Sequence, residues 1–122
     1  MIKVAIIILH NKENKVLFME RDDDAPTYPS KWGVFGGAIE NEETPVEAVK
    51  RECMEELSYE LKNPRLVYEG KFCEAYGYVF SEAFDSSKDL ILGEGKSMGW
   101  FTLDEIKKKN TIPFSFEIFF KN

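Results

Sequence analysis

Six residues between positions 37 and 56 have the types and the spacing needed to hold a divalent cation against a phosphate chain. They are a glycine, an arginine and four glutamates: Gly37, Glu43, Arg51, Glu52, Glu55 and Glu56. Two like charges about 4 Å apart near a protein surface repel by roughly 4 kcal/mol, so this density of carboxylates is costly unless a cation offsets it. Hard ions such as Mg²⁺ and Mn²⁺ prefer oxygen ligands, whereas one histidine and two cysteines in the whole chain do not suit zinc. The pattern therefore predicts a magnesium or manganese site.

The last four of these residues are expected to lie on one helix. Thr44, Pro45 and Glu47 supply a capping hydroxyl, a proline at the first helical position and a carboxylate that reaches back to the cap. The helix is therefore predicted to begin at Pro45. At about 100° per residue, four apolar side chains form one stripe: Val46, Val49, Cys53 and Leu57. The arginine and the glutamates fall on an adjoining arc, so one side of the helix is expected to face a core and the next a cleft.

The alternative is an ordinary charged helix face in solvent. Such faces usually carry lysines between the acids, because like charges four residues apart cost roughly 0.2–0.5 kcal/mol. Glu52 and Glu56 have this spacing, with only Arg51 close by. The sequence therefore favours a cation site over a solvated face.

Residues 37–59 follow the spacing G-x5-E-x7-R-E-x2-E-E and resemble the Nudix box, and the chain resembles a small MutT-like Nudix hydrolase. The resemblance implies an α/β fold, the family's helix-sheet-helix sandwich with a mixed sheet. The sequence departs from the family pattern at Ser58, where a glycine usually follows the helix, and at Cys53 and Tyr59, where bulky aliphatic residues are usual. A left-handed helix end is less favourable by roughly 1 kcal/mol for residues other than glycine. Ser58 is therefore expected to loosen the helix end slightly without touching the metal ligands.

The resemblance also implies a role for each residue of the box. The expected metal ligands are the backbone carbonyl of Gly37 and the carboxylates of Glu52, Glu55 and Glu56. One of these glutamates is also expected to deprotonate the attacking water. Arg51 and Glu43 match positions that pair with and orient the glutamates. Glu94 lies a few residues before Trp100, as does a late glutamate of MutT-like members that reaches the metal site or acts as base; the alternative is a loop acid in solvent.

Fewer residues point to the substrate. Arg21, at the end of the second predicted strand, resembles a position that meets substrate phosphates in some relatives; the alternative is a surface arginine. Five aromatic residues are candidates to stack on a base, although strand aromatics are more often core residues: Tyr28, Trp32, Phe35, Tyr76 and Tyr78. The asparagine that purine-sanitising members carry near the C-terminus is not evident in residues 114–116, which argues against an oxidised guanine nucleotide.

Length and composition indicate a single domain over residues 1–122, with 43% hydrophobic and 14% aromatic residues to build its core. A net charge of −6 argues against a nucleic-acid partner, and the lysines at 107–109 are expected to solvate a short surface helix. The apolar run at residues 1–9 is too short for a signal peptide or a membrane span, so we expect a cytoplasmic protein without membrane contact. Cys53 and Cys73 are expected to be reduced core thiols.

The remaining elements follow from hydrophobic periodicity and turn residues. Strands are predicted at residues 2–9, 15–21, 32–35, 65–73, 76–84 and 97–101. Gly36 and Gly37 are expected to form a turn, and His10 belongs to a turn at residues 10–14. A second capping box, at Thr102, predicts another helix, and residues 113–120 fit either a short helix or a strand.

The predicted function is Mg²⁺-dependent hydrolysis of a pyrophosphate bond in a nucleoside diphosphate linked to another moiety, by water attack on phosphorus. The expected partner is a small nucleotide, such as a nucleoside triphosphate or a nucleotide sugar; the sequence does not fix its identity or the oligomeric state. Three alternatives remain open. They are a nucleotide-binding module without catalysis, a Ca²⁺-buffering domain, and a nucleotide-sugar hydrolase that attacks carbon. Retention of every box glutamate argues against the first, and the lack of an EF-hand loop argues against the second.

Overall fold

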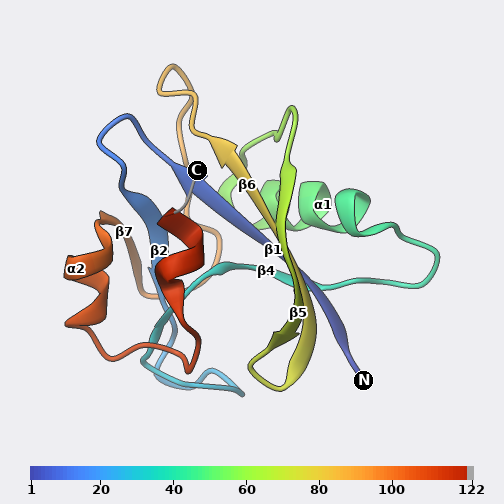
Figure 1. Ribbon diagram of the computed structural model, residues 1–122, viewed down its shortest axis with the longest axis horizontal. Helices are drawn as coiled ribbons and strands as arrows, with labels where there is room; N and C mark the ends of the chain where they lie inside the picture. Colours follow the sequence, from blue (N-terminus) through green and yellow to red (C-terminus); the bar gives the residue numbers. More distant parts are fainter. Residues whose placement is uncertain (121–122) are drawn as a thin grey trace.

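The chain folds around a mixed β-sheet, with one long helix on one face and two short helices on the other (Figure 1). The computed structural model describes residues 1–120. Their strands are β1 (Lys3–His10), β2 (Val16–Glu20), β3 (Trp32–Gly33), β4 (Phe35–Ala38), β5 (Arg65–Phe72), β6 (Ala75–Ala83) and β7 (Ser97–Phe101). Their helices are α1 (Pro45–Leu57), α2 (Leu103–Lys107) and the 3₁₀ helix η1 (Phe116–Phe120). This arrangement confirms the predicted helix-sheet-helix sandwich.

Strand β1 lies at the centre of the sheet. Along one edge it runs parallel to β6, from Lys3 opposite Tyr76 to His10 opposite Ala83. Along the other edge it pairs antiparallel with β4 in its first half and with β2 at its end. Strands β3 and β7 pair with β2, and β5 pairs with β6, all antiparallel. The sheet is therefore mixed, as predicted.

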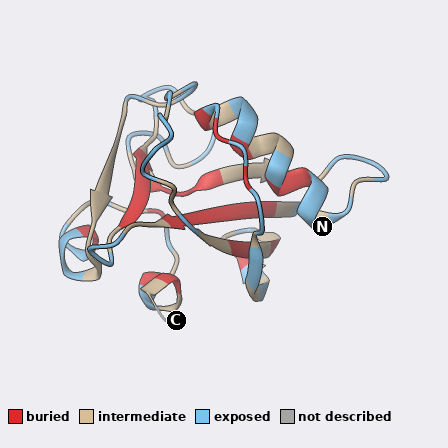
Figure 2. Cartoon of the chain, turned by 90° about the horizontal axis from the view of Figure 1, so that it is seen from above, coloured by how far each residue is buried: buried red, intermediate tan, exposed pale blue. Residues whose placement is uncertain are grey.

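The side chains of β1 divide the core into two layers. Ala5, Ile7 and Leu9 pack with α1, whereas Ile6 and Ile8 pack with α2 and η1. This alternation is the two-residue period of a strand. Figure 2 shows the buried strands between helices whose outer sides are exposed. Because both faces of β1 are covered, its sequence is a continuous apolar run, as predicted for a strand buried on both sides.

The paired glycines lie in a strand, so the predicted turn at Gly36 and Gly37 is wrong. The single strand predicted at 32–35 is divided into β3 and β4, and β4 continues through both glycines to pair with β1. Gly36 has a φ of +147°, and a Cβ added there would overlap the carbonyl oxygen of Ala5. Glycine is therefore required at this position because the two strands approach closely, and not because the chain turns.

Helix α1 begins at Pro45, as its capping box predicts. The Thr44 hydroxyl accepts a hydrogen bond from the Glu47 amide at 3.2 Å, and the Glu47 carboxylate accepts one from the Thr44 amide at 2.8 Å. The buried residues of the helix are Ala48, Val49, Cys53 and Leu57. Val46, which was predicted in the apolar stripe, is 38% exposed, because the first turn of α1 projects beyond the strands (Figure 1).

The prediction that both cysteines are core thiols is correct for Cys53 and wrong for Cys73. Cys53 is fully buried under α1. Strand β5 ends at Phe72, and Cys73 is half-buried in the turn between β5 and β6, with a φ of +56°. Both thiols are free, as expected.

The C-terminal aromatic segment forms a helix, which decides between the two forms that its sequence allowed. In η1, Phe116 and Phe119 are buried, and their rings lie 5.2 and 6.5 Å from that of Phe18. The capping box at Thr102 starts α2, as predicted. Among residues 1–120, no helix is both long enough and apolar enough to cross a membrane.

The left-handed end of α1 leads to a stability prediction. Ser58 caps the helix with φ 52° and ψ 36°, and its amide donates to the Met54 carbonyl at 3.0 Å. Ser58→Gly is expected to raise the free energy of unfolding by about 0.5–1 kcal/mol, because glycine adopts this conformation without a steric penalty. Urea titration measures the change. Ser58→Ala keeps the Cβ and is the control; a glycine variant no more stable than the alanine variant would contradict the prediction.

Candidate active site

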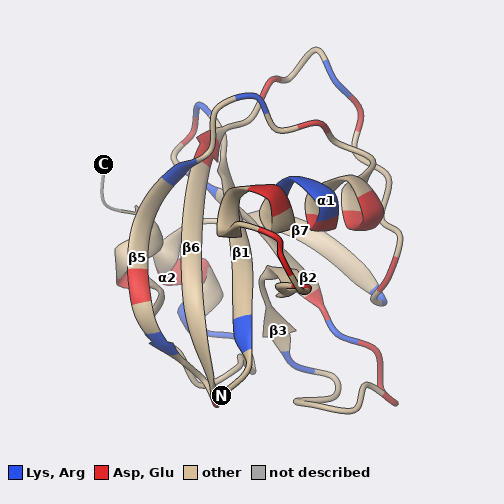
Figure 3. Ribbon diagram, turned by 90° about the vertical axis from the view of Figure 1, so that its right-hand side faces the viewer, with Lys and Arg blue, Asp and Glu red and all other residues tan. Residues whose placement is uncertain are grey.

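Arg51 is the centre of an acidic network along α1, on which Figure 3 shows basic and acidic positions close together. Its Nε and Nη2 donate to the two oxygens of Glu43 at 2.6 and 3.0 Å, and its Nη1 donates to Glu52 at 3.0 Å and to Glu55 at 3.2 Å. Its Nη2 also donates to the carbonyl of Ala38, at 3.1 Å. The guanidinium lowers the pKa of Glu43 to about 2. The expected pairing is therefore present, and Arg51 ties the loop before α1, strand β4 and two box glutamates together.

Glu56 lies against β4, in a more buried position. Its Oε1 accepts a hydrogen bond from the Gly36 amide at 2.8 Å. Burial raises the pKa of Glu56 to about 8; the Gly36 hydrogen bond opposes the shift, and the charges of Glu52, Glu94 and Glu55 reinforce it. Negative charge is thus concentrated where little water is present to stabilise it. The sequence did not reveal the Gly36 contact, because both glycines were assigned to a turn.

Gly37 packs directly against Glu52. An ideal Cβ at Gly37 would fall 2.5 Å from Oε1 of Glu52, so glycine is the residue that fits beside this carboxylate. Burial raises the pKa of Glu52, and Arg51 opposes that shift. The Glu52 side chain is 14% exposed, compared with 58% for Glu55. Two of the predicted ligand carboxylates therefore lie against β4, at Glu52 and Glu56, and the third lies nearer to solvent.

The chemistry of these donors fits a hard divalent cation. Three carboxylates and a glycine carbonyl offer only oxygen atoms, which Mg²⁺ and Mn²⁺ prefer. Burial, reinforced by the charges of neighbouring glutamates, raises the pKa of Glu56, and a bound cation would favour its ionised form. Within residues 1–120, no three acidic, histidine or cysteine side chains converge into a ready-made metal site, since Arg51 and the Gly36 amide hold the carboxylates in separate interactions.

The segment of residues 91–96 brings Glu94 to the same region. The amides of Ile91 and Gly93 donate to the carbonyls of Leu57 and Glu56 at 2.9 and 2.8 Å. These carbonyls belong to the last turn of α1, where no partner is available within the helix. The charge of Glu94 contributes to the raised pKa of Glu56. The structure therefore places Glu94 near Glu56, and its role in the site stays a prediction.

The other end of this segment is fixed to β2 and to the loop after it. Gly95 has a φ of +93°, and an added Cβ would lie 2.7 Å from the sulfur of Met19. The ammonium of Lys96 pairs with Asp23 at 2.7 Å and with Glu20 at 3.6 Å. Sequence reasoning missed these anchors, and the adjacent glycine was the one local signal that could have revealed them.

Glu56 and Glu94 lie in the wall of a cleft of about 510 Å³, a size typical of small-molecule sites. Arg21 also lines the cleft, and it donates from Nε to the Thr27 carbonyl at 2.9 Å and from Nη2 to the Thr27 hydroxyl at 3.2 Å. Of the predicted site residues, the cleft is lined by Arg21, Gly37, Glu56 and Glu94. Its lining does not include Arg51, Glu52 or Glu55. Residues from three distant parts of the chain thus meet at one cavity.

Of the five aromatic residues considered for base stacking, Tyr28 is the one that lines this cleft. Phe35 is 1% exposed and belongs to the core under α1. Trp32 packs edge-on against Phe101, and the two tyrosines of β6 pack against each other. The five rings therefore do not form one stacking wall, because strand alternation and tertiary packing direct the other four elsewhere, as is more usual for aromatic residues in strands.

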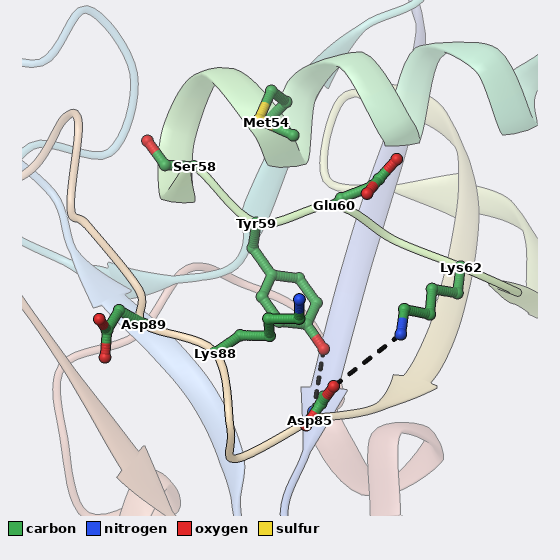
Figure 4. Close-up of a pocket in the computed structure, with 8 residues that line it drawn as sticks. All are labelled: Met54, Ser58, Tyr59, Glu60, Lys62, Asp85, Lys88 and Asp89. Atoms are coloured by element: carbon green, nitrogen blue, oxygen red, sulfur yellow. Dashed lines mark hydrogen bonds and ion pairs between the residues drawn. The ribbon is translucent and has the colours of Figure 1, made fainter.

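A second hollow, of about 250 Å³, lies beside the end of α1 (Figure 4). There the Tyr59 hydroxyl accepts a hydrogen bond from the Asp85 amide at 2.9 Å, and Lys62 lies 4.0 Å from the Asp85 carboxylate. None of the predicted site residues lines this hollow, and its charges are of both signs. The cleft at β4 is therefore the candidate active site.

The family of the chain is established by its match to the NUDIX domain model over residues 1–121. The chain belongs to the Nudix family. More narrowly, the chain is similar to MutT-like Nudix hydrolases, as its match to a MutT protein of 25% identity shows. Family and neighbours together support hydrolysis of compounds linked to a nucleoside diphosphate.

Three solved structures illustrate the likeness. The MutT protein of Methanosarcina mazei Go1 is 25% identical, with a TM-score of 0.80 over 98% of this chain and 89% of that one. A MutT structure, described for Aliivibrio salmonicida and Vibrio cholerae together, is 21% identical. Its TM-score is 0.74 over 88% of this chain and 85% of that one. The E. coli dihydroneopterin triphosphate pyrophosphohydrolase is 18% identical, with a TM-score of 0.70 over 89% and 85%. No curated protein matches the sequence.

The raised pKa of Glu56 predicts how stability depends on pH when no metal is present. The folded-state pKa of about 8 lies above the ordinary 4.5, so this stabilising contribution is complete below pH 4.5 and is lost as the pH rises to 8. Glu56→Gln cannot ionise and is expected to be more stable than the unmodified protein at pH 8, by about 1–3 kcal/mol.

Urea titrations with a chelator, at pH 5 and pH 8, measure this difference. Glu60→Gln is the control, because Glu60 is exposed just beyond α1 and should leave the pH dependence unchanged. Parallel pH profiles for the Glu56 variant and the unmodified protein would show that Glu56 is not the group responsible.

Proposed function

We propose that this chain is a single Nudix domain that hydrolyses a pyrophosphate bond in a nucleoside diphosphate linked to another moiety, with Mg²⁺ and by water attack on phosphorus. The observation that carries the proposal is the meeting of Glu56 and Glu94 with Arg21 in one cleft, beside the glycines of β4. The acidic wall suits a cation, and the arginine suits an anion held next to it. The net charge of −6 favours a small nucleotide over a nucleic acid as the partner.

Four groups would hold Mg²⁺, or Mn²⁺ in its place. They are the carbonyl of Gly37 and the carboxylates of Glu52, Glu55 and Glu56. When bound, the cation supplies neutralising charge to the phosphate oxygens and to the leaving group. Arg51 keeps Glu52 and Glu55 oriented through its 3.0 and 3.2 Å hydrogen bonds, and the Gly36 amide does the same for Glu56.

The remaining steps belong to residues of the cleft. Arg21, held by Thr27, places positive charge where phosphate oxygens would lie. Glu56 and Glu94 both reach the cleft, so each is positioned to accept the proton of the attacking water. The backbone hydrogen bonds of Ile91 and Gly93 hold the segment that carries Glu94 against the end of α1, next to Glu56.

Loss of the Glu56 carboxylate tests the proposal directly. Glu56→Gln is expected to keep the fold and to lose at least about a hundredfold in kcat, because both a metal ligand and a proton acceptor are removed. The measurement is phosphate and product release from nucleoside triphosphates, nucleotide sugars, ADP-ribose and dinucleoside polyphosphates, with Mg²⁺ and with Mn²⁺.

Glu60→Gln is the matched control, because Glu60 lies just beyond the end of α1 and outside the cleft. This variant should retain full activity. Near-normal turnover in the Glu56 variant would refute the assignment. A protein that binds nucleotides but releases no product would instead be a binding module. Hydrolysis in ¹⁸O-water places the label on a phosphate if phosphorus is attacked, and on the sugar if carbon is attacked.

The anchored position of Glu94 gives a separate kinetic prediction. Gly95→Ala is expected to lower kcat about tenfold with little change in KM, because a side chain at φ +93° meets Met19 and displaces Glu94. Steady-state kinetics and thermal melting measure both effects. Gly70→Ala is the control: its φ of +154° is also unfavourable for alanine, but Gly70 is on β5, outside the cleft. Equal losses of kcat in the two variants would contradict a positioning role.

A further inference from the structure

Two residues of the cleft are carried by segments that leave the sheet at the same point. Glu20 of β2 lies opposite Ser97 of β7, at the last pair of the ladder between these strands. Arg21 directly follows Glu20, and Glu94 precedes Ser97 by three residues. Both Arg21 and Glu94 line the cleft. Their relative position therefore depends on how two diverging segments are held together: the Arg21 loop, which connects β2 to β3, and the segment of residues 91–96.

The position of the Arg21 guanidinium depends on the Arg21 loop. Its two hydrogen bonds both go to Thr27 of that loop, and no other hydrogen bond or ion pair reaches it in the part of the chain that the structure describes. The loop is held in shape by the Asp22 carbonyl, which accepts from the amides of Ala25 and Ser30 at 3.2 and 3.1 Å. A displacement of the loop would therefore move the guanidinium as well.

The segment that carries Glu94 is attached to β2 through its backbone. The Lys96 amide donates to the Glu20 carbonyl at 2.9 Å. The Ser97 hydroxyl donates to the Glu20 carboxylate, also at 2.9 Å. These contacts end at the last residue of β2. They do not reach the interior of the Arg21 loop.

One ion pair connects the segment of Glu94 to the interior of that loop. Nζ of Lys96 donates to Oδ1 of Asp23 at 2.7 Å, and the same oxygen accepts from the Ser30 hydroxyl at 2.5 Å. Within the described chain, no other hydrogen bond or ion pair joins these two parts. Asp23 therefore binds the far arm of its own loop through Ser30 and the segment of Glu94 through Lys96.

The location of this ion pair argues for a role in the site. Lys96 does not line the cleft, so its ammonium is not among the groups that would contact a phosphate chain there. The Lys96 side chain is 40% exposed and that of Asp23 is 70% exposed. Ion pairs as exposed as this one contribute little to stability, because water and salt screen the charges. Stability is therefore a weaker explanation for the pair than its place between two walls of the cleft.

We propose that Lys96 is a positioning residue, which acts through Asp23 to hold the Arg21 loop in place relative to Glu94. The inference rests on the proposed hydrolysis for the roles of Arg21 and Glu94. In that reaction the phosphates and the attacking water must meet both residues at once, and a displacement of about 1 Å can cost up to about a hundredfold in rate. A smaller loss is expected without the ion pair, because the backbone contacts to Glu20 remain.

Amide hydrogen exchange tests the connection without turnover. Lys96→Gln is expected to speed exchange of the Ala25 and Ser30 amides about tenfold, because the Arg21 loop loses its contact with the segment of Glu94 and opens more often. Lys107→Gln is the matched control. It removes an exposed lysine ion pair on α2, outside the cleft, and should leave both amides unchanged.

Steady-state kinetics test the effect on the site. Lys96→Gln is expected to lower kcat/KM about tenfold with a melting temperature close to that of Lys107→Gln. Lys96→Arg keeps the charge and should stay within about threefold of the unmodified protein. In an Arg21→Ala background, Lys96→Gln should cost less than about a further threefold, because effects that act through one group are not additive. Asp23→Asn should reproduce the loss, and adding Lys96→Gln to it should lower kcat/KM little further.

Unchanged exchange in Lys96→Gln would overturn the inference, as would an unchanged kcat/KM or full additivity with Arg21→Ala. The two proposals fail separately. Nucleotide cleavage that is insensitive to Lys96→Gln would leave the hydrolytic function standing and the positioning role wrong. If exchange responds but the unmodified protein cleaves no nucleotide, the hydrolytic function is wrong. Calorimetry with an α,β-methylene nucleoside diphosphate and Mg²⁺ then decides the positioning role, which requires weaker binding in Lys96→Gln and is overturned by equal binding.

Discussion

The site depends on holding several carboxylates close together where water is scarce. Burial raises the pKa of both Glu52 and Glu56, so each would be more easily ionised in open solvent. Arg51 donates to the first and the Gly36 amide to the second, and each donor favours the charged form of its partner. Neither neutralises the cluster as a whole. The repulsion between the ionised glutamates that remains is unfavourable for folding, and a bound cation would offset it.

Packing on the other side of α1 prevents the helix from relieving that repulsion. Cys53 and Leu57 alternate with the glutamates along the helix, and both are fully buried. Burial of a large apolar side chain stabilises a fold by about 1.5–3 kcal/mol, so rotation of the helix away from β4 would sacrifice this stabilisation at the buried positions. Strand β4 cannot retreat either, because its glycines bring it against β1. The acids are therefore held between a core on one side and a sheet on the other.

Features set by neighbours in sequence were predictable, and features set by distant contacts were not. The start of α1 follows from Thr44 and Glu47 alone, and the box spacing places the acids on one arc of the helix. The strand through Gly36 was misassigned, because its cause is the approach of β1 from thirty residues earlier in the chain. Val46 has the correct helical phase but lies beyond the edge of the sheet, which no periodicity reveals. The cleft likewise exists only after three distant segments have packed together.

The two ends of the cleft are built by different kinds of structure. At the acidic end, Glu56 is held by helix α1 and by the pairing of β4 with β1. Solved structures that are only 18–25% identical to this chain have the same fold. At the other end, Tyr28 and Glu74 come from a loop and a hairpin turn, which can change in sequence without altering the sheet. The glutamate pattern is therefore apparent from the sequence, whereas the residues that line the rest of the cleft become apparent only when the loop and the turn are placed around it.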